Sequence, residues 1–263
     1  MTKKIIMPKL TIQNRKNQNI VLILDQAKNA KGLAFVMHGL GGFKEQPHIQ
    51  AMANAFKENN YTVVNFDATN SLGQSGGKIE DVTATAHDED LEDVIKWAQS
   101  QPWYKEPFCL AGHSLGSMSV VLYAENFPEK VKAIAPISTV ISGKLVLLSY
   151  PKEDLEEWEK SGLREEISRS KPGAIKRLLW SFILDILKYD LLKKVDKLTM
   201  PVLLIVGERD KSTPVKYQKI LYEKLPAKKE LHVIKGSGHT FREKEHIEEV
   251  KNILSNWIKK LDA

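Results

Sequence analysis

Short apolar segments alternate with longer segments of helical periodicity along most of the chain. The apolar segments lie at residues 32–39, 61–67, 106–112, 130–138, 200–207 and 230–236. Helical patterns cover residues 46–60, 87–101, 114–127, 214–225 and about 242–261. This alternation is typical of parallel βαβ units. The pattern therefore predicts an α/β fold, in which a mostly parallel sheet carries helices on both faces.

The beginning of the chain departs from this alternation. Residues 9–15 and 19–26 both have strand character, and only residues 16–18 separate them, which leaves no room for a helix. We therefore expect an antiparallel hairpin at the edge of the sheet. With this hairpin the sheet should have about eight strands.

A second departure runs from residue 140 to residue 195. Helical and irregular segments that contain Trp158 and Trp180 take the place of a simple crossover helix. We interpret residues 140–195 as a helical cap (lid) insertion, and residues 1–139 and 196–263 as the core domain that carries it. The alternative is a helical elaboration that only packs on the sheet.

Composition and charge exclude several classes of protein. The 263 residues carry a net charge of +6, but basic and acidic side chains are interleaved at helical spacing. Such interleaving is typical of solvated helix faces, so we expect no nucleic-acid partner. No run approaches the ~18 apolar residues of a membrane span, and the start lacks a signal-peptide core, so we expect a cytoplasmic protein without stable membrane insertion. The one cysteine, Cys109, lies in an apolar run and should be a buried, unreactive thiol.

Candidate chemistry begins at Ser114, which lies between Gly112 and Gly116 where a predicted strand passes into a predicted helix. This G-x-S-x-G spacing allows a sharp turn from which the serine oxygen projects beyond the sheet. A structural turn is the alternative. Because a serine hydroxyl is a poor nucleophile without a base, the other strand ends decide between the two interpretations.

The best candidate for the base is His239, in a loop of small residues after the last predicted strand. It would lie at the same edge of the sheet as Ser114, because the ligand crevice of a parallel sheet lies beyond the carboxyl ends of its strands. The remaining histidines are expected to be structural or exposed: His87 and His246 at exposed helix positions, His48 near a helix start, His232 within a strand, and His38 and His113 in turns.

An acid that orients the base should follow another strand. Both Glu208 and Asp210 follow the apolar strand at residues 200–207, and Asp210 is the better candidate because it lies further out on the loop. The order Ser114, Asp210, His239 is the one that an α/β-hydrolase arrangement requires.

A glycine-rich loop follows the strand at residues 32–39. Its glycines allow the backbone to approach a reacting carbon, so the N–H of Leu40 and that of Leu115, directly after the serine, could form an oxyanion hole. A phosphate-binding loop is the competing interpretation. The loop has neither the Gly-Lys-Ser/Thr ending of a P-loop nor a G-x-G-x-x-G frame.

Together, residues 38–45, 65–77, 112–116, 207–214 and 236–241 resemble the α/β-hydrolase superfamily, and within it the carboxylesterase, monoacylglycerol lipase and cinnamoyl (feruloyl) esterase branch. The resemblance implies Ser114 as nucleophile, Asp210 as acid, His239 as base, and Leu40 and Leu115 as oxyanion donors. One departure is Asn70, where many relatives have glycine, and this change could shape the pocket differently.

These residues predict a serine hydrolase that cleaves carboxylic esters through an acyl-enzyme, without metal or organic cofactor. The expected partner is a small-molecule ester, and the chain is expected to be a monomer or homodimer. Phe43, Trp158, Trp180 and Phe182 are candidates to line the substrate pocket, although aromatic residues at helical spacing also suit a plain core. Monoacylglycerol lipase or thioesterase activity is the alternative, followed by a serine peptidase or a noncatalytic relative.

Overall fold

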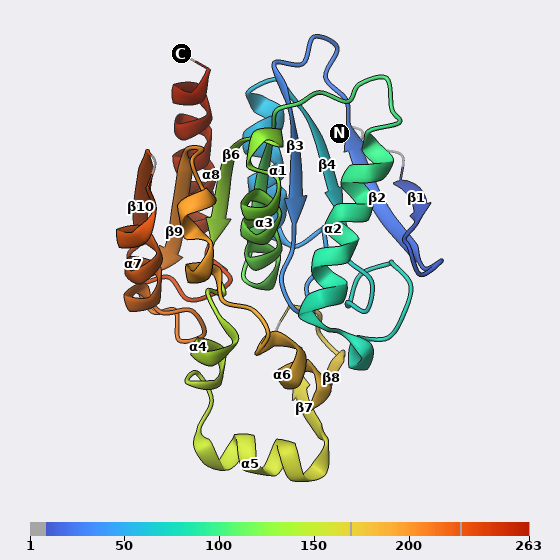
Figure 1. Cartoon of the computed structure of the whole chain (residues 1–263), viewed down its shortest axis with the longest axis vertical. Helices are drawn as coiled ribbons and strands as arrows, with labels where there is room; N and C mark the ends of the chain where they lie inside the picture. Colours follow the sequence, from blue (N-terminus) through green and yellow to red (C-terminus); the bar gives the residue numbers. More distant parts are fainter. Residues whose placement is uncertain (1–8, 169, 227, 263) are drawn as a thin grey trace.

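The main sheet accounts for every strand that the sequence predicts. A computed structural model of the chain describes residues 9–168, 170–226 and 228–262, and these residues form an eight-stranded sheet in the order β1-β2-β4-β3-β5-β6-β9-β10 (Figure 1). The opening stretch, for which the sequence predicts no signal peptide, lies outside the described residues up to residue 8. The strands are β1 (Lys9–Gln13), β2 (Asn19–Asp25), β3 (Gly32–Met37), β4 (Tyr61–Phe66), β5 (Phe108–His113), β6 (Val131–Ile137), β9 (Val202–Gly207) and β10 (Lys229–Ile234).

The strand directions confirm the predicted α/β fold. β1 and β2 form an antiparallel hairpin at one edge, and β2 pairs antiparallel with β4. All other neighbours in this sheet pair in parallel. The hairpin forms because only five residues, 14–18, connect the two strands, and they make a tight turn in which Asn17 takes a left-handed φ of 57°.

Two layers of helices bury the two faces of the sheet. Helices α1 (Pro47–Glu58) and α8 (Lys244–Leu261) cover one face, and α2 (Ala84–Ala98), α3 (Leu115–Asn126) and α7 (Val215–Lys224) cover the other. Along β3, Leu33 and Phe35 enter the core beneath the second layer, whereas Ala34 and Val36 face the first. Burial on both faces explains why the central strands read as continuous apolar runs.

The segment between β6 and β9 differs in part from the predicted helical insertion. It contains α4 (Gly143–Leu147), α5 (Lys152–Ser161) and α6 (Ser181–Ile186), but also an antiparallel hairpin of β7 (Leu163–Ile167) and β8 (Ile175–Leu179). Opposite charges face each other across the hairpin, since Glu165 pairs with Arg177 and Glu166 with Lys176. These cross-strand pairs stabilise two strands that are too short and too charged to be recognised from the sequence.

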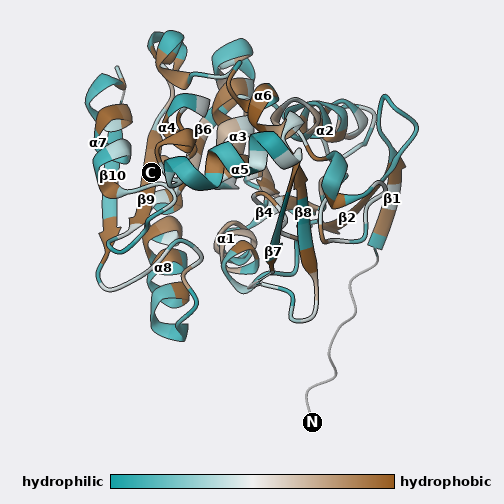
Figure 2. Cartoon of the chain, turned by 90° about the horizontal axis from the view of Figure 1, so that it is seen from below, coloured by the Kyte–Doolittle hydropathy of each residue, from teal (hydrophilic) through white to brown (hydrophobic). Residues whose placement is uncertain are grey.

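The segment between β6 and β9 lies beyond the carboxyl ends of the parallel strands. Figure 1 shows α4, α6 and the hairpin below the ends of these strands, with α5 farthest from the sheet. Figure 2, viewed from that side, shows β7 and β8 beside α5 in front of the sheet. Single 3-10 turns complete the described chain: η1 (Ile79–Asp81), η2 (Pro128–Lys130), η3 (Leu191–Lys193) and η4 (Val195–Lys197).

Two further features bear on the expectations from composition. None of the helices in the described residues combines the length and the apolar character needed to cross a membrane. Cys109 is fully buried in β5, and burial raises the pKa of its thiol to about 12, which confirms the prediction of an unreactive side chain.

A buried ion pair ties together the loops that follow β3 and β4. Lys44 and Asp67 are both completely buried, and the Lys44 Nζ donates to Asp67 Oδ2 at 2.6 Å. The backbone N–H groups of Lys44 and Gln74 donate to the same carboxylate at 2.7 and 2.8 Å. Lys44 Nζ also donates to Gln74 Oε1 at 3.1 Å. Lys44 and Asp67 thus take part in four hydrogen bonds that connect the two loops.

Replacing Lys44 by methionine should destabilise the protein strongly. The substitution leaves the buried Asp67 carboxylate without its cation, and breaking such a pair costs about 3–5 kcal/mol. Urea unfolding measures the loss. The control is Lys16→Met, which removes an exposed ion pair to Glu89 and should cost no more than about 1 kcal/mol. Equal losses for the two variants would contradict the prediction.

Candidate active site

The turn between β5 and α3 holds Ser114 in a left-handed backbone conformation. Its φ is 55° and its ψ is −115°, and its N–H donates to the carbonyl of Ile137 in β6 at 2.9 Å. A β-carbon added at Gly116 would lie 2.3 Å from the carbonyl oxygen of His38, and one added at Gly112 would lie 2.4 Å from that of Gly116. Both glycines are therefore needed for the close approach of the neighbouring backbones.

Ser114, His239 and Asp210 form a continuous hydrogen-bonded chain. Nδ1 of His239 lies 2.8 Å from Oδ2 of Asp210, and its Nε2 lies 3.0 Å from Oγ of Ser114. Because a carboxylate only accepts hydrogen bonds, Nδ1 carries the proton of the neutral ring. Nε2 is then the acceptor for the Ser114 hydroxyl. The three residues come from the ends of β5, β9 and β10.

Asp210 is held as an ionised carboxylate. It is buried, yet it accepts hydrogen bonds from the N–H groups of Ser212 and Thr213 and from the Thr213 hydroxyl, each at 2.9 Å. Burial raises the pKa of this carboxyl, but the hydrogen bonds and the charge interaction with His239 outweigh burial and hold the pKa below its usual value. The ionised form can therefore orient the His239 ring.

The alternative carboxylate, Glu208, lies elsewhere. Its Oε2 accepts a hydrogen bond from the N–H of Gly236 at 2.8 Å, and the side chain is exposed. This contact links the loop after β9 to the loop after β10. The structure thus brings Asp210, and not Glu208, to the His239 ring.

The glycine loop after β3 passes close to the serine. A β-carbon on Gly39 would lie 2.8 Å from Cβ of Ser114, and the loop closes through a hydrogen bond from the Gly42 N–H to the Gly39 carbonyl at 2.9 Å. Within the described part of the chain, the N–H groups of Leu40 and Leu115 donate to no acceptor. Both residues line the same cavity as Ser114, so both N–H groups are available to a ligand.

Two buried histidines support that loop from below. His38 Nδ1–H donates to the Gly39 carbonyl at 2.8 Å, and its Nε2 accepts from the Ala68 N–H at 3.0 Å. His87 Nε2–H donates to the His38 carbonyl at 2.9 Å. The prediction of an exposed His87 is wrong: the residue faces inward from α2, and burial lowers its pKa to about 3.

His113, directly before the serine, holds the loop that carries His239. Its Nε2–H donates to the carbonyl of His239 at 2.7 Å, and the two rings pack with centroids 4.8 Å apart. Burial, with the neighbouring His239, lowers the pKa of His113 to about 3, so this ring is a neutral donor near pH 7. The structural role expected for His38 and His113 from their positions beside glycine agrees with these contacts.

A cavity of about 630 Å³ opens over Ser114. Its apolar side chains come mainly from the segment between β6 and β9 and include Val140, Val146, Tyr150, Phe182 and Ile186. Polar side chains complete the lining. They come from the loops that follow β3, β9 and β10, from the first turns of α1 and α8, and from the segment between β6 and β9, which contributes Ser149, Glu166, Ser168, Ser170 and Lys176.

Of the four aromatic residues expected in this pocket, Phe182 lines the cavity, and Phe43, Trp158 and Trp180 do not. Trp158 is only 1% exposed and donates from Nε1 to the carbonyl of Leu178 at 2.8 Å. Trp180 packs edge-on against Trp158, with ring centroids 5.8 Å apart. Both tryptophans therefore serve packing within the segment between β6 and β9, where β8 contacts Trp158.

Asn70, which stands where many α/β-hydrolases were expected to have glycine, has a backbone conformation that glycine commonly adopts. Asn70 has a φ of 54°, in the left-handed region that asparagine tolerates. Its side chain donates to the Asp81 carbonyl and accepts from the Lys78 N–H, at 3.3 and 3.2 Å. Asn70 does not line the cavity, so it fixes the loop after β4 and does not shape the pocket directly.

Comparisons with known proteins point to one superfamily. A family model described as X-Pro dipeptidyl-peptidase (S15 family) matches residues 22–163. The human protein ABHD12B is 25% identical over 190 residues, which cover 71% of this chain and 48% of that protein. The chain thus spans about half the length of this relative.

Solved structures share the fold over nearly the whole chain. The structure of Est1E from Butyrivibrio proteoclasticus with bound ferulic acid has a TM-score of 0.80 at 21% identity, and the match covers 96% of this chain and 98% of Est1E. Mouse α/β-hydrolase domain-containing protein 10 has a TM-score of 0.79 at 22% identity, covering 97% of this chain and 99% of that one. A monoacylglycerol lipase from Paleococcus ferrophilus has a TM-score of 0.72 at 22% identity, covering 92% and 99%.

The lowered pKa of Asp210 should make stability fall in acid. A carboxyl whose folded pKa lies below its unfolded value of about 3.9 stabilises the fold above that value, and the contribution is lost as pH falls towards the folded pKa. Asp210→Asn removes this titration. Between pH 6 and pH 3 the variant should therefore lose less unfolding free energy than the wild type, measured by urea unfolding at each pH. Parallel profiles for the two proteins would refute this.

Proposed function

Because the chain belongs to the X-Pro dipeptidyl-peptidase (S15) family of α/β-hydrolases, we propose that it is a serine hydrolase that cleaves carboxylic esters through an acyl-enzyme. The observation that carries the proposal is the unbroken chain of hydrogen bonds from Ser114 through His239 to Asp210. Each bond has a length and a direction suited to moving the serine proton onto the imidazole.

In the first half of the reaction, Ser114 attacks the ester carbonyl. Nε2 of His239 takes the proton from Oγ as the oxygen forms a bond to the carbonyl carbon, and the carbonyl electrons move onto its oxygen. The N–H groups of Leu40 and Leu115 donate to this oxyanion. The ionised Asp210 stabilises the imidazolium that has formed. The bond to the alcohol oxygen then breaks, and the alcohol leaves with the proton from Nε2.

In the second half, water hydrolyses the acyl-enzyme by the same route. Nε2 of His239 takes a proton from water, the hydroxyl attacks the acyl carbon, and the same two N–H groups stabilise the oxyanion. Collapse releases the carboxylic acid, and Ser114 recovers its proton from His239. The cycle consumes one water and needs no group besides these side chains and backbone amides.

Several features support an ester as substrate. The 630 Å³ cavity has room for a small acyl group and a small alcohol. Among the structural relatives, Est1E has been seen with ferulic acid bound, and another is a monoacylglycerol lipase. We propose residues 140–195 as a cap that supplies Val146, Phe182 and Ile186 to the acyl side of this cavity.

Peptide hydrolysis is the second candidate, because the matching family is described by a peptidase activity. The same serine, histidine and carboxylate can cleave an amide if the pocket binds a dipeptide that ends in proline. The two activities differ in the leaving group, which is an alcohol from an ester and an amine from a peptide.

Ser114→Ala should abolish hydrolysis of p-nitrophenyl butyrate, with kcat/KM at least about 10³-fold lower, because the nucleophile is lost. His239→Ala should lose nearly as much, since the two residues act as a unit. A fluorophosphonate probe should label the wild type and not Ser114→Ala. Ser100→Ala, an exposed serine outside the cavity, is the matched control and should retain both properties. Activity that survives in Ser114→Ala would refute the mechanism.

A direct comparison of substrates separates esterase from peptidase. We expect kcat/KM for p-nitrophenyl butyrate to exceed that for alanyl-proline p-nitroanilide by more than about 10³-fold. Both reactions release a coloured product, so one absorbance assay serves for both. A higher kcat/KM for the anilide would replace the ester proposal by peptide hydrolysis, and in that case Ser114→Ala must still abolish the activity.

A further inference from the structure

The cavity over Ser114 has a polar arm where two helices begin. α1 starts at Pro47 and α8 at Lys244, and the two helices pack against each other. Gln46 and His48 line the cavity from the start of α1, and Arg242, Glu243 and His246 line it from the start of α8. These helices contain 12 and 18 residues, and because residues at both starts line the cavity, the positive ends of two helix dipoles lie beside it.

The side chain of His48 is a second, independent indication that this arm binds a ligand. Its side chain is 96% buried, lines the cavity and packs edge-on against the His113 ring, yet its buried Nε2 has no hydrogen-bond partner within the described residues. Burial, together with the neighbouring His113, holds the pKa of His48 well below its usual value. The ring is thus a neutral donor, and a buried polar group normally has a partner. A group bound in this arm would provide one.

Arg242 has unused hydrogen-bonding capacity in the same arm. Its Nε donates to the hydroxyl of Thr240 at 3.1 Å, and its terminal nitrogens contact no acceptor in the described parts of the chain. The acidic residues that line the cavity are Glu166, which is ion-paired with Lys176, and Glu243, which has no ion pair among the described residues. A guanidinium with two free nitrogens suits an anion with two or more oxygens.

The position of Arg242 indicates which part of an ester would lie in this arm. Arg242 follows His239 by three residues on the loop after β10. In an ester hydrolase the departing oxygen takes its proton from the histidine, so the alcohol must lie beside His239. The polar arm is therefore adjacent to the alcohol, whereas the apolar side chains of the cavity come mainly from the region between β6 and β9.

We propose that this arm, formed by His48, Arg242 and the first turns of α1 and α8, binds a carboxylate or phosphate on the leaving alcohol. The inference rests on the proposed ester hydrolysis and adds a substrate class to it: esters whose alcohol carries an anionic group. Glu243 opposes binding of the anion and limits it, because its carboxylate lies in the same arm.

The test uses four esters of matched size. Propyl butyrate is uncharged, the butyrates of 3-hydroxypropanoate and of 3-hydroxypropyl phosphate carry the anion on the alcohol, and propyl hydrogen succinate carries it on the acyl group. Acid release gives kcat/KM for each. In Arg242→Gln, the ratio of either alcohol-side anionic ester to propyl butyrate should fall about tenfold. In Glu243→Gln the same ratio should rise.

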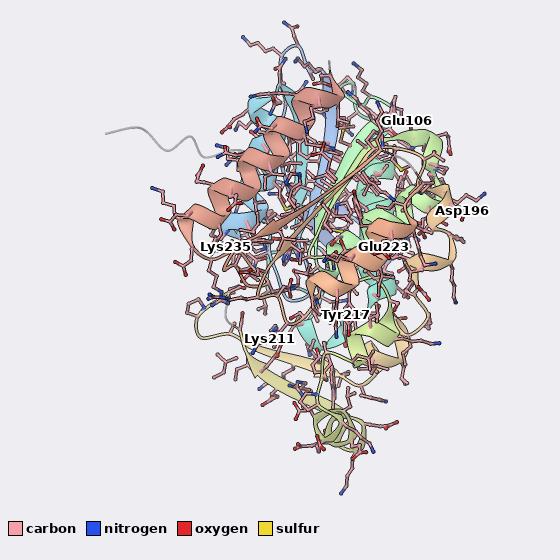
Figure 3. The ribbon with its side chains drawn as sticks, turned by 90° about the vertical axis from the view of Figure 1, so that its left-hand side faces the viewer. Glu106, Asp196, Lys211, Tyr217, Glu223 and Lys235 are labelled. Carbon is pink, nitrogen blue, oxygen red and sulfur yellow. The ribbon has the colours of Figure 1, made fainter. Side chains whose placement is uncertain are left out.

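The matched control is Lys235→Gln, which removes one exposed positive charge from the same loop without touching the cavity (Figure 3). Its ratio should stay within about twofold of wild type. An unchanged ratio in Arg242→Gln, an equal fall in Lys235→Gln, or a fall with the succinate ester alone overturns the proposal. A fall with only the carboxylate or only the phosphate supports it and identifies the anion.

A binding measurement separates the anion-site proposal from the proposal of ester hydrolysis. Failure to cleave any of the four esters, propyl butyrate included, would refute the proposed function and not the anion site. Calorimetric titration of Ser114→Ala with 3-hydroxypropyl phosphate tests the site without catalysis. Binding that weakens about tenfold on adding Arg242→Gln supports the site. Equal or undetectable binding in both proteins overturns it.

Discussion

The left-handed backbone of Ser114 is the constraint around which the site is organised. A non-glycine residue at a φ of 55° is strained by about 1–3 kcal/mol and persists only where its surroundings fix it. Here β6 fixes it, because Ile137 accepts hydrogen bonds from the Ser114 N–H and from the Ser117 hydroxyl. The glycine loop contributes through its close contact with Gly116. The strain is thus balanced by contacts from two neighbouring strands, and the serine oxygen has a fixed position before any ligand binds.

Around this turn, buried histidines and one buried ion pair hold the loops in place. His38 and His87 fix the loop after β3, Lys44 and Asp67 join that loop to the one after β4, and His113 fixes the loop after β10. The buried histidines stay uncharged near pH 7, because burial lowers the pKa of each. These three histidines therefore place no uncompensated charge beneath the serine, and the orientation of His239 depends on Asp210 and on the loop geometry.

The sheet and the positions of Ser114, Asp210 and His239 could be read from the sequence, because apolar runs mark the strands and each residue directly follows one. The β7–β8 hairpin could not, since its strands have only five residues each and all their side chains are exposed or partly exposed except that of Leu178. The burial of His87 was missed because a polar residue on the inner face of α2 looks like a surface residue. The free donors of His48 and Arg242 depend on contacts between distant segments, which no local pattern reports.

β6 and β9 are neighbours in the sheet, with Ile134 opposite Val202 and Ile137 opposite Ile205. The residues between these strands add no strand to the main sheet, although they provide much of the apolar lining of the cavity. The main sheet and much of the apolar lining of the cavity are therefore encoded by different stretches of the chain. A substitution at a lining position of this segment, such as Val146, would therefore change the wall of the cavity while the pairing of β6 with β9 is kept.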